Sequence, residues 1–297
     1  MRGTAAPTIV SMRFAVVAHQ ESPTNTGLVG AAQACGLDAI LLEPREALRL
    51  LEPGDVALAR LDVRDGLDGV EKGMPELERL VAAGIEVLNP PSSLVVSHDK
   101  LLTARALRLA GLPHPQTSLI AGGMPTTAPE LPLVLKPRFG SWGRDVELCR
   151  TTDDLDAALA RAAFTSWFRE HGALAQELVP PLGWDLRLVV AGERVVGAAR
   201  RVAADGEWRT NAALGARIEP VDPPPLARTL AIAAARAIRA DLAGVDLLPT
   251  RNGFVVLELN GAVDFRPLYA RVGDVYTEAV LALLGAADRR AVVAVGA

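Results

Sequence analysis

The chain has 297 residues, of which 50% are hydrophobic and 22% charged, a composition typical of a folded globular protein of about two domains. The formal charge of −4 argues against a protein that binds nucleic acid or an anionic membrane by electrostatic attraction. Two cysteines, Cys35 and Cys149, are too few for a disulfide framework or a four-cysteine zinc site. We therefore expect a cytoplasmic protein, and no apolar run reaches the ~20 residues of a membrane span.

The first third of the chain predicts a small α/β domain over residues 12–95. Short apolar runs typical of buried parallel strands lie at Phe14–Ala18, Ala39–Leu42, Val56–Ala59 and Ile85–Leu88. Helical patterns separate these runs, at Thr26–Cys35, Glu46–Leu51 and Pro75–Ala83. Residues 1–11 hold no continuous apolar segment, so we expect a loose extension rather than a signal peptide, with Met1 and Met12 as alternative starts.

The middle third predicts a helix, a loop and two strands. Ser97 or Asp99 is expected to cap a helix that runs to Ala110. Residues 122–132 are rich in Gly, Pro and Thr, which is typical of a loop. The predicted elements that follow are strands at Leu133–Lys136 and Asp145–Cys149 and a helix at Thr151–Ala163.

The last third predicts two hairpins on either side of a long helix. Leu186–Val190 and Val195–Ala199 flank a turn with a central glycine, Gly192. An alanine-rich helix is expected over Leu226–Leu242. The second hairpin joins Val245–Leu248 to Phe254–Leu259.

This second hairpin predicts a metal site. If residues 251–253 form a three-residue loop, Thr250 faces Phe254, and Asp246 lies directly opposite Glu258. Two like charges in that position destabilise a sheet unless a cation lies between them. Asn260 points to the same face, so three hard oxygen donors suit magnesium, while Val255, Leu257 and Leu259 point into a core. The alternative is a solvated acidic face or a salt bridge to an arginine.

A second segment predicts phosphate binding. Lys136 ends a strand, and Gly140 and Gly143 follow it in a short loop where backbone N–H groups can approach a phosphate. The segment is neither a Walker A loop nor a dinucleotide Gly-x-Gly-x-x-Gly. An ordinary hairpin turn is the alternative.

Taken in chain order, these segments resemble the ATP-grasp superfamily, and within it the RimK-type carboxylate–amine ligases, from about Asn89 to Tyr269. The matching segments are His98–Thr103, Gly111–Thr117, Val134–Pro137, Gly140–Gly143, Gln176–Val179, Gly183–Arg187, Arg201 with Glu207–Asn211, Gly244–Leu248 and Leu257–Asn260. The resemblance implies an ATP-grasp fold of mixed α/β and α+β class. Its parts are an N-terminal pre-ATP-grasp α/β domain over residues 12–95, a central lid subdomain over 96–175, and a C-terminal antiparallel α+β subdomain with the metal site over 176–287.

The resemblance also implies a role for each matching residue. The lysines Lys100 and Lys136 would hold the ATP phosphates, and the arginines Arg187 and Arg201 would stabilise the transferred phosphoryl group. The implied metal ligands are Asp246, Glu258 and Asn260, for two magnesium ions or, alternatively, manganese. The remaining nucleotide contacts would come from the loop Gly140, Ser141, Trp142 and Gly143, the adenine hinge Gln176, Glu177, Leu178 and Val179, and from Asp185 and Asn211.

The implied reaction is ATP-dependent amide formation through an acyl phosphate, on amino-acid-like substrates such as those of a glutamate ligase. Phe265-Arg266 is similar to a pair in the LysX-type relatives, so Arg266 is expected to face a substrate carboxylate, with a surface salt bridge as the alternative. Arg60, at the end of the third predicted strand, is expected to face a substrate carboxylate as well, with a plain surface charge as the alternative. The partner is then a small carboxylate and amine, or a carrier protein or peptide, and we expect a homo-oligomer. A nucleotide-binding regulator and a kinase without ligation are the alternatives.

Overall fold

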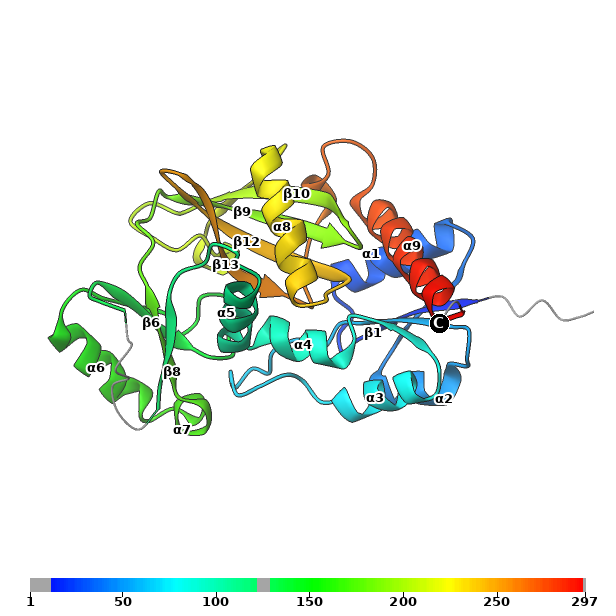
Figure 1. The fold of residues 1–297 in the computed structure, drawn as a ribbon, viewed down its shortest axis with the longest axis horizontal. Helices are drawn as coiled ribbons and strands as arrows, with labels where there is room; N and C mark the ends of the chain where they lie inside the picture. The colour runs from blue at the N-terminus through cyan, green and yellow to red at the C-terminus, as the bar shows by residue number, and fades with distance from the viewer. Residues whose placement is uncertain (1–11, 122–128, 296–297) are drawn as a thin grey trace, which may run out of the picture.

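The computed structural model describes residues 12–121 and 129–295, arranged around three β-sheets (Figure 1). The expectations for residues 1–11 and for most of the loop at 122–132 lie outside these residues. No helix within the two described stretches has the length and apolar character needed to cross a lipid bilayer.

The N-terminal sheet is parallel and has the strand order β2-β1-β3-β4. Its central strand β1 (Arg13–Val17) alternates between two cores, with Phe14 and Val16 facing helix α1 (Pro23–Ala34), and Ala15 and Val17 facing the opposite side. Burial on both faces explains why the strands of this sheet are continuous apolar runs. The other elements are β2 (Asp38–Leu42), α2 (Pro44–Leu50), β3 (Val56–Ala59), α3 (Met74–Ala82) and β4 (Glu86–Leu88).

Two helices connect this sheet to the next. Helix α4 (Pro91–His98) was not among the expected elements, and α5 (Lys100–Leu109) follows it directly. The carboxylate of Asp99 accepts hydrogen bonds from the first backbone N–H groups of α5, which confirms Asp99 as the predicted cap. Lys100 is therefore held in the first turn of a capped helix.

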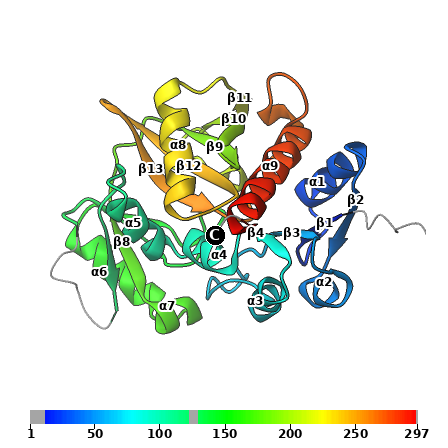
Figure 2. The same cartoon turned by 45° about the vertical axis from the view of Figure 1, so that its right-hand side comes forward.

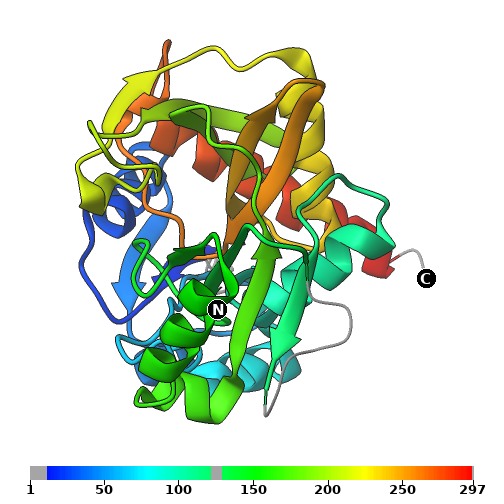
Figure 3. The same cartoon turned by 90° about the vertical axis from the view of Figure 1, so that its left-hand side faces the viewer.

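The lid sheet is antiparallel, with the order β5-β8-β6-β7, and two helices cover one of its faces (Figures 1 and 3). On β6 (Leu133–Pro137), Leu133 and Leu135 pack under these helices, while Val134 and Lys136 point to the other face. That period of two places Lys136 at a cavity. The remaining elements are β5 (Thr117–Ile120), β7 (Glu147–Cys149), α6 (Thr152–Ala162), α7 (Ser166–His171) and β8 (Ala173–Glu177).

The C-terminal sheet is antiparallel, with the order β11-β10-β9-β12-β13. Helix α8 (Pro225–Ala237) covers one face, and α9 (Val275–Val295) covers the other and also contacts α1, so one core joins the first and last parts of the chain (Figure 2). The strands are β9 (Trp184–Ala191), β10 (Arg194–Val202), β11 (Arg217–Pro220), β12 (Leu242–Thr250) and β13 (Gly253–Asn260).

The predicted end of the long helix at Leu242 is wrong. Helix α8 ends at Ala237, and Arg239 adopts a left-handed backbone conformation with a φ of 58°, which an α-helix cannot accommodate. Leu242 is instead the first residue of β12, where its side chain is fully buried. The helix therefore ends before Gly244, the glycine expected to stop it, is reached, at a boundary that holds Arg239 and Asp241.

The predicted three-residue turn of the last hairpin is also wrong, although the predicted pairing of Asp246 with Glu258 is correct. Thr250 pairs with Gly253, so the loop has two residues rather than three. A bulge at Leu257 shifts the register back and sets Asp246 opposite Glu258, as expected. Leu259 points into the core as expected, but the shorter loop and the bulge place Val256 in the core instead of Val255 and Leu257, and Leu257 lines a cavity.

Candidate functional site

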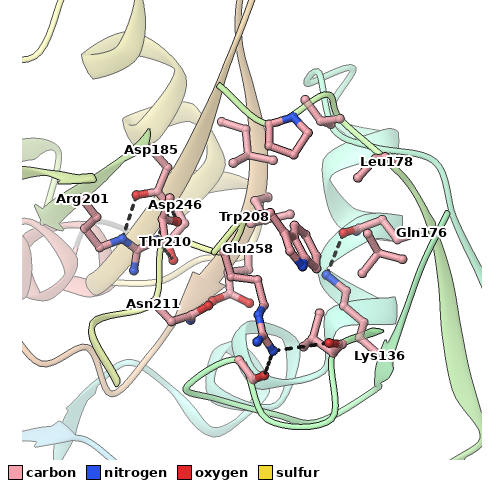
Figure 4. Close-up of a pocket in the computed structure, with 18 of the residues that line it drawn as sticks. Lys136, Gln176, Leu178, Asp185, Arg201, Trp208, Thr210, Asn211, Asp246 and Glu258 are labelled. Carbon is pink, nitrogen blue, oxygen red and sulfur yellow. Dashed lines mark hydrogen bonds and ion pairs between the residues drawn. The ribbon is translucent and has the colours of Figure 1, made fainter. Parts of the chain in front are cut away.

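Two adjoining cavities lie where the lid sheet faces the C-terminal sheet. The main cavity is lined by β6 and the end of β8 on one side and by β12 and β13 on the other, and Figure 4 shows these two walls. The second cavity lies toward the N-terminal domain, between Asp62, the loop after β13 and Tyr269. The two cavities share five lining residues, namely Ser141, Trp142, Arg201, Asn211 and Glu258.

The two predicted lysines lie on the wall of the main cavity. Lys136 is 4% exposed, and its Nζ donates a hydrogen bond of 2.7 Å to Oε1 of Gln176 (Figure 4). Burial, assisted by the positive charge of Lys100, lowers the pKa of Lys136 to about 8, although the carboxylate of Glu258 opposes the change. Lys100 donates to the carbonyl oxygen of Gly140 and forms an ion pair of 3.3 Å with Glu258.

The predicted glycine loop, residues 140–143, lies against the opposite wall. Gly143 has a φ of 71°, and a Cβ there would come within 2.8 Å of Asn211 Oδ1, so this position requires glycine. Arg209 Nη1 donates a hydrogen bond of 3.0 Å to the carbonyl oxygen of Gly143. On the other side, Arg144 Nη2 donates one of 2.9 Å to the carbonyl oxygen of Asp65. The loop is thus tied to both flanking domains.

Trp142 is the exposed residue of this loop. Its side chain lines both cavities, and 51% of its surface is accessible. Its φ of 62° is unusual for a bulky residue, and such conformations gather at functional sites.

The predicted adenine hinge lines the apolar end of the main cavity. Gln176 is the penultimate residue of β8, and Glu177, Leu178 and Val179 continue along the cavity wall. Nearby side chains give this end flat apolar surfaces suited to an aromatic base, namely Val134, Val146, Trp208, Leu248 and Leu257.

Strand β9 runs from the candidate site into the hydrophobic core. At its end, Val189 and Ala191 pack in the core beneath α9, while two and four positions earlier on the same face the residues are Arg187 and Asp185. The neighbouring strands supply partners in register, because Asp246 pairs with Arg187 and Arg201 pairs with Asp185. Three strands thereby bring four charged side chains together.

Asp246 is the centre of this charged network. Its Oδ1 accepts a hydrogen bond of 2.7 Å from Arg187 Nε, and its Oδ2 accepts bonds of 2.7 Å from Arg187 and 2.8 Å from Arg201. Arg201 also forms a two-pronged ion pair with Asp185, which accepts a further bond from Thr210 Oγ1 (Figure 4). The salt bridge considered as an alternative for the acidic hairpin therefore exists.

Burial and pairing set the charges of the network. Burial opposes ionisation of Asp246, but the guanidinium groups of Arg187 and Arg201 outweigh it and hold the pKa of this carboxyl well below its usual range. Burial likewise opposes the positive charge of Arg201, whose pKa is nevertheless raised by the carboxylates of Asp246 and Asp185. Both arginines therefore stay charged beside Asp246.

The residues expected to bind metal lie close together, but they are not equally available. Asp246 and Glu258 are partners across the β12–β13 ladder, and Asn260 pairs with Gly244 two positions farther along. Glu258 and Asn260 offer hard oxygen donors that fit magnesium at the junction of the cavities, whereas both oxygens of Asp246 already accept bonds from guanidinium groups. Among residues 12–121 and 129–295, no three His, Cys, Asp or Glu side chains gather closely enough to hold a metal by themselves.

Arg60 and Arg266, the expected substrate contacts, lie outside the two cavities. Arg60 is buried, and it donates hydrogen bonds of 2.5 Å to Asn25 Oδ1 and 2.9 Å to the carbonyl oxygen of Val263. It therefore joins the end of β3 to the loop after β13. Arg266 is exposed, while its neighbour Phe265 packs against Tyr276 in the core.

Other cavity residues were not expected from the sequence. Asp62 and Asp264 line the second cavity, and Trp208, Thr210 and Leu257 line the main one. Asp62 follows β3, and Asp264 follows β13. The sequence signal that could have identified them as cavity residues was an acidic side chain shortly after the end of a strand.

Known proteins resemble this chain in sequence and in fold. Curated relatives include a probable alpha-L-glutamate ligase of Legionella pneumophila (strain Corby), 32% identical over 200 residues, and a probable alpha-L-glutamate ligase 2 of Shewanella amazonensis, 34% identical over 187 residues. These alignments cover 64% of this chain and 64% of the first relative, and 60% of each protein for the second.

Among solved structures, a RimK domain ATP-grasp protein of Sphaerobacter thermophilus has a TM-score of 0.65 and 22% identity, covering 92% of this chain and 100% of that one. A D-alanine–D-alanine ligase of Bacillus anthracis has a TM-score of 0.65 at 16% identity, over 94% of this chain and 98% of that one. Both confirm the expected fold. A family model described as a RimK-like ATP-grasp domain matches residues 97–275, so the chain belongs to the RimK-like ATP-grasp family.

Proposed function

We propose that this protein is an ATP-dependent ligase that joins a carboxylate to an amine through an acyl-phosphate intermediate. The observation that carries the proposal is the shared boundary of the two cavities, where Ser141, Trp142, Arg201, Asn211 and Glu258 line both. A reaction between ATP and a second substrate needs such adjoining sites, because the reacting atoms must meet. The relatives described as probable alpha-L-glutamate ligases support the same reaction class.

The main cavity suits ATP from end to end. Its apolar end, with Val134, Leu178 and Leu257, accepts the flat base, and the backbone after Gln176 reads the base edge. The opposite end holds Lys136 and Lys100, whose positive charges match the phosphates. The γ-phosphate would then lie at the boundary with the second cavity.

The reaction needs activation because a carboxylate repels nucleophiles and lacks a good leaving group. Transfer of the γ-phosphoryl group to a carboxylate oxygen releases ADP and leaves an acyl phosphate. Attack by an amine then forms the amide and expels inorganic phosphate. We assign to Arg187 and Arg201 the stabilisation of charge that develops on the transferred group, since both guanidinium groups are held in place by Asp246.

Two further features of the site support this chemistry. Glu258 and Asn260, and Asp246 with them if its arginine contacts rearrange, would hold magnesium or manganese, which neutralises phosphate charge when bound. The loop 140–143 lies at the boundary of both cavities, where it would keep water from the acyl phosphate. The proposal also includes the division of the ATP-grasp region into a lid subdomain over residues 96–175 and a C-terminal subdomain over residues 176–287.

ADP release in a matrix of carboxylates and amines, with ATP and magnesium, tests the function. We expect release that requires both partners, together with a product whose mass is that of the amide. ADP release that depends on one substrate and needs no amine would show a kinase. ATP binding without release from any pair, including a carrier protein or peptide, would show a regulator, and either result contradicts the proposal.

A further inference from the structure

The second cavity has two differently charged ends. At the end shared with the main cavity, Arg201 lines both cavities, and Arg187, which donates to the same Asp246 carboxylate, lines the second cavity. At the other end the charged side chains that line it are Asp62 and Asp264, neither of which reaches the main cavity. A substrate lying across this cavity therefore meets cations at its reacting end and carboxylates at its far end.

Both carboxylates at the far end are accessible and incompletely paired. The Asp62 side chain is 44% exposed, and its Oδ1 accepts a hydrogen bond of 2.7 Å from the N–H of Val63. The Asp264 side chain is 50% exposed, and its Oδ1 accepts one of 3.3 Å from Ser22. For each residue, Oδ2 accepts no hydrogen bond within the described part of the chain.

The positive charge nearby does not balance these two carboxylates. Arg60 lies beneath the far end, 3.5 Å from Asp264, but its guanidinium also donates hydrogen bonds to Asn25 and to the carbonyl oxygen of Val263. His98 Nδ1 lies 3.9 Å from Asp62, yet burial lowers the pKa of His98, so its ring adds no charge at neutral pH. Among the side chains paired with one another here, two carboxylates stand against one guanidinium, which leaves a net negative charge.

At the reacting end, by comparison, positive and negative side chains neutralise one another. Arg187 and Arg201 are matched by Asp246 and Asp185, and Lys100 is matched by Glu258. The phosphates of ATP add negative charge there, and the metal that they bind adds positive charge. The cavity is therefore polarised, with Asp62 and Asp264 on the part of its lining that the main cavity does not share.

On the basis of the ligase reaction proposed above, we infer that the carboxylate substrate is an amino-acid-type zwitterion, whose ammonium group contacts Asp62 and Asp264 while its carboxylate lies at Arg187 and Arg201. Charge-assisted hydrogen bonds to the two Oδ2 atoms would hold the ammonium group. A dicarboxylate would place its second negative charge against Asp62 and Asp264, and this repulsion would exclude it. The specificity therefore differs from that of an enzyme that activates a diacid.

A series of carboxylates that differ only in the terminal group tests this inference. The probes are ω-amino acids of two to six carbons, the alkanoates of equal length, and the matching dicarboxylates, each with ATP, magnesium and hydroxylamine. Hydroxylamine displaces phosphate from an acyl phosphate and leaves a hydroxamate, so activation is measured without knowledge of the natural amine. We expect kcat/KM for the preferred ω-amino acid to exceed that for the matching alkanoate and dicarboxylate at least tenfold.

The matched variants are the double substitution D62N/D264N and the control D156N, whose residue is exposed on α6 and lines neither cavity. The double variant should lose the tenfold preference, mainly through KM. D156N should keep the preference. A dicarboxylate used as well as the ω-amino acid, or a preference that survives in the double variant, would overturn the inference.

Measurements of substrate binding separate a failure of this inference from a failure of the proposed ligase reaction. If no carboxylate yields hydroxamate or ADP, isothermal titration calorimetry of the same probes on the protein loaded with AMPPNP decides the inference separately. Tighter binding of the ω-amino acid than of the alkanoate and dicarboxylate, abolished by D62N/D264N, supports it. Equal or tighter binding of the dicarboxylate, or no binding of the ω-amino acid, overturns it.

Discussion

Arg201 and Asp246 are 45 positions apart in the chain and are joined by a buried hydrogen bond of 2.8 Å between Arg201 Nη2 and Asp246 Oδ2. Strand β9 lies between β10, which carries Arg201, and β12, which carries Asp246. Arg187 on β9 donates a hydrogen bond to the same carboxylate. A guanidinium held in this way needs no rearrangement when charge develops in the transition state. We regard this pair as the fixed side of the site, opposite the glycine loop.

The first prediction concerns R201K. Lysine keeps the charge but cannot bridge Asp185 and Asp246 with a planar fork, so stabilisation of the transferred phosphoryl group is lost. We expect kcat to fall by about 100-fold or more, the effect of removing one such donor, with little change in the dissociation constant of AMPPNP. R194K, at an exposed ion pair on the same strand, should retain wild-type kcat. Equal activity of R201K and wild type would contradict the assigned role.

The second prediction concerns pH and Lys136. Because the pKa of Lys136 is lowered to about 8 in the free protein, its positive charge is lost as pH rises through that value. Bound phosphate favours the charged form, so the dissociation constant of AMPPNP should increase between pH 7 and pH 9, and the increase should be much smaller in K136M. Titration by calorimetry across this range measures both proteins. The same pH dependence in K136M would assign the effect to another group.

The nucleotide-free protein should show the opposite trend in stability. Lys136 has a pKa of about 8 when folded and 10.5 as a model value, so between these values the unfolded chain binds more protons than the folded one. The free energy of unfolding contributed by this residue therefore rises with pH over that interval. Denaturant unfolding of wild type and K136M at pH 8 and pH 10 would measure the difference in slope.

The third prediction concerns G143A. A methyl group at Gly143 would meet Asn211 Oδ1 at 2.8 Å and strain a backbone with a φ of 71°, so the glycine loop must shift. We expect kcat/KM for ATP to fall about tenfold or more, and the protein to lose about 1–3 kcal/mol of stability. G206A is the control, since Gly206 has a φ of 78° but nothing within 4 Å of the added atom. An equal loss of kcat/KM in both variants would show that backbone strain, rather than the contact with Asn211, is responsible.

The fourth prediction concerns E258Q. Removing the negative charge weakens the place assigned to magnesium and leaves Lys100 without its ion-pair partner at 3.3 Å. We expect turnover to be abolished and the magnesium dependence of AMPPNP binding to weaken, while the circular dichroism spectrum stays that of wild type. Wild-type turnover in E258Q would remove Glu258 from the mechanism.

The sequence predicted the positions of several candidate site residues where local patterns were sufficient. Lys136 at the end of a strand, the Gly140–Gly143 loop and the opposition of Asp246 and Glu258 were all expected from neighbouring residues. The last of these held although the turn was wrong, since the bulge at Leu257 compensated for the shorter loop.

The remaining features depend on which strands are neighbours. That Arg187 pairs with Asp246 follows from β9 lying beside β12, an order that no local periodicity reveals. The role of Arg60 was missed for the same reason, because its partner Val263 lies 203 positions later in the chain. The end of α8 was missed because Arg239 takes a left-handed conformation that its residue type does not favour.

Transfer of oxygen from the carboxylate to phosphate tests the central claim most directly. The substrate carboxylate is labelled with ¹⁸O, and the inorganic phosphate released during amide formation is analysed by mass spectrometry. An acyl-phosphate pathway predicts one ¹⁸O atom per phosphate, because the bridging oxygen comes from the carboxylate and leaves with the phosphoryl group. Phosphate without label, released while the amide accumulates, would contradict the account.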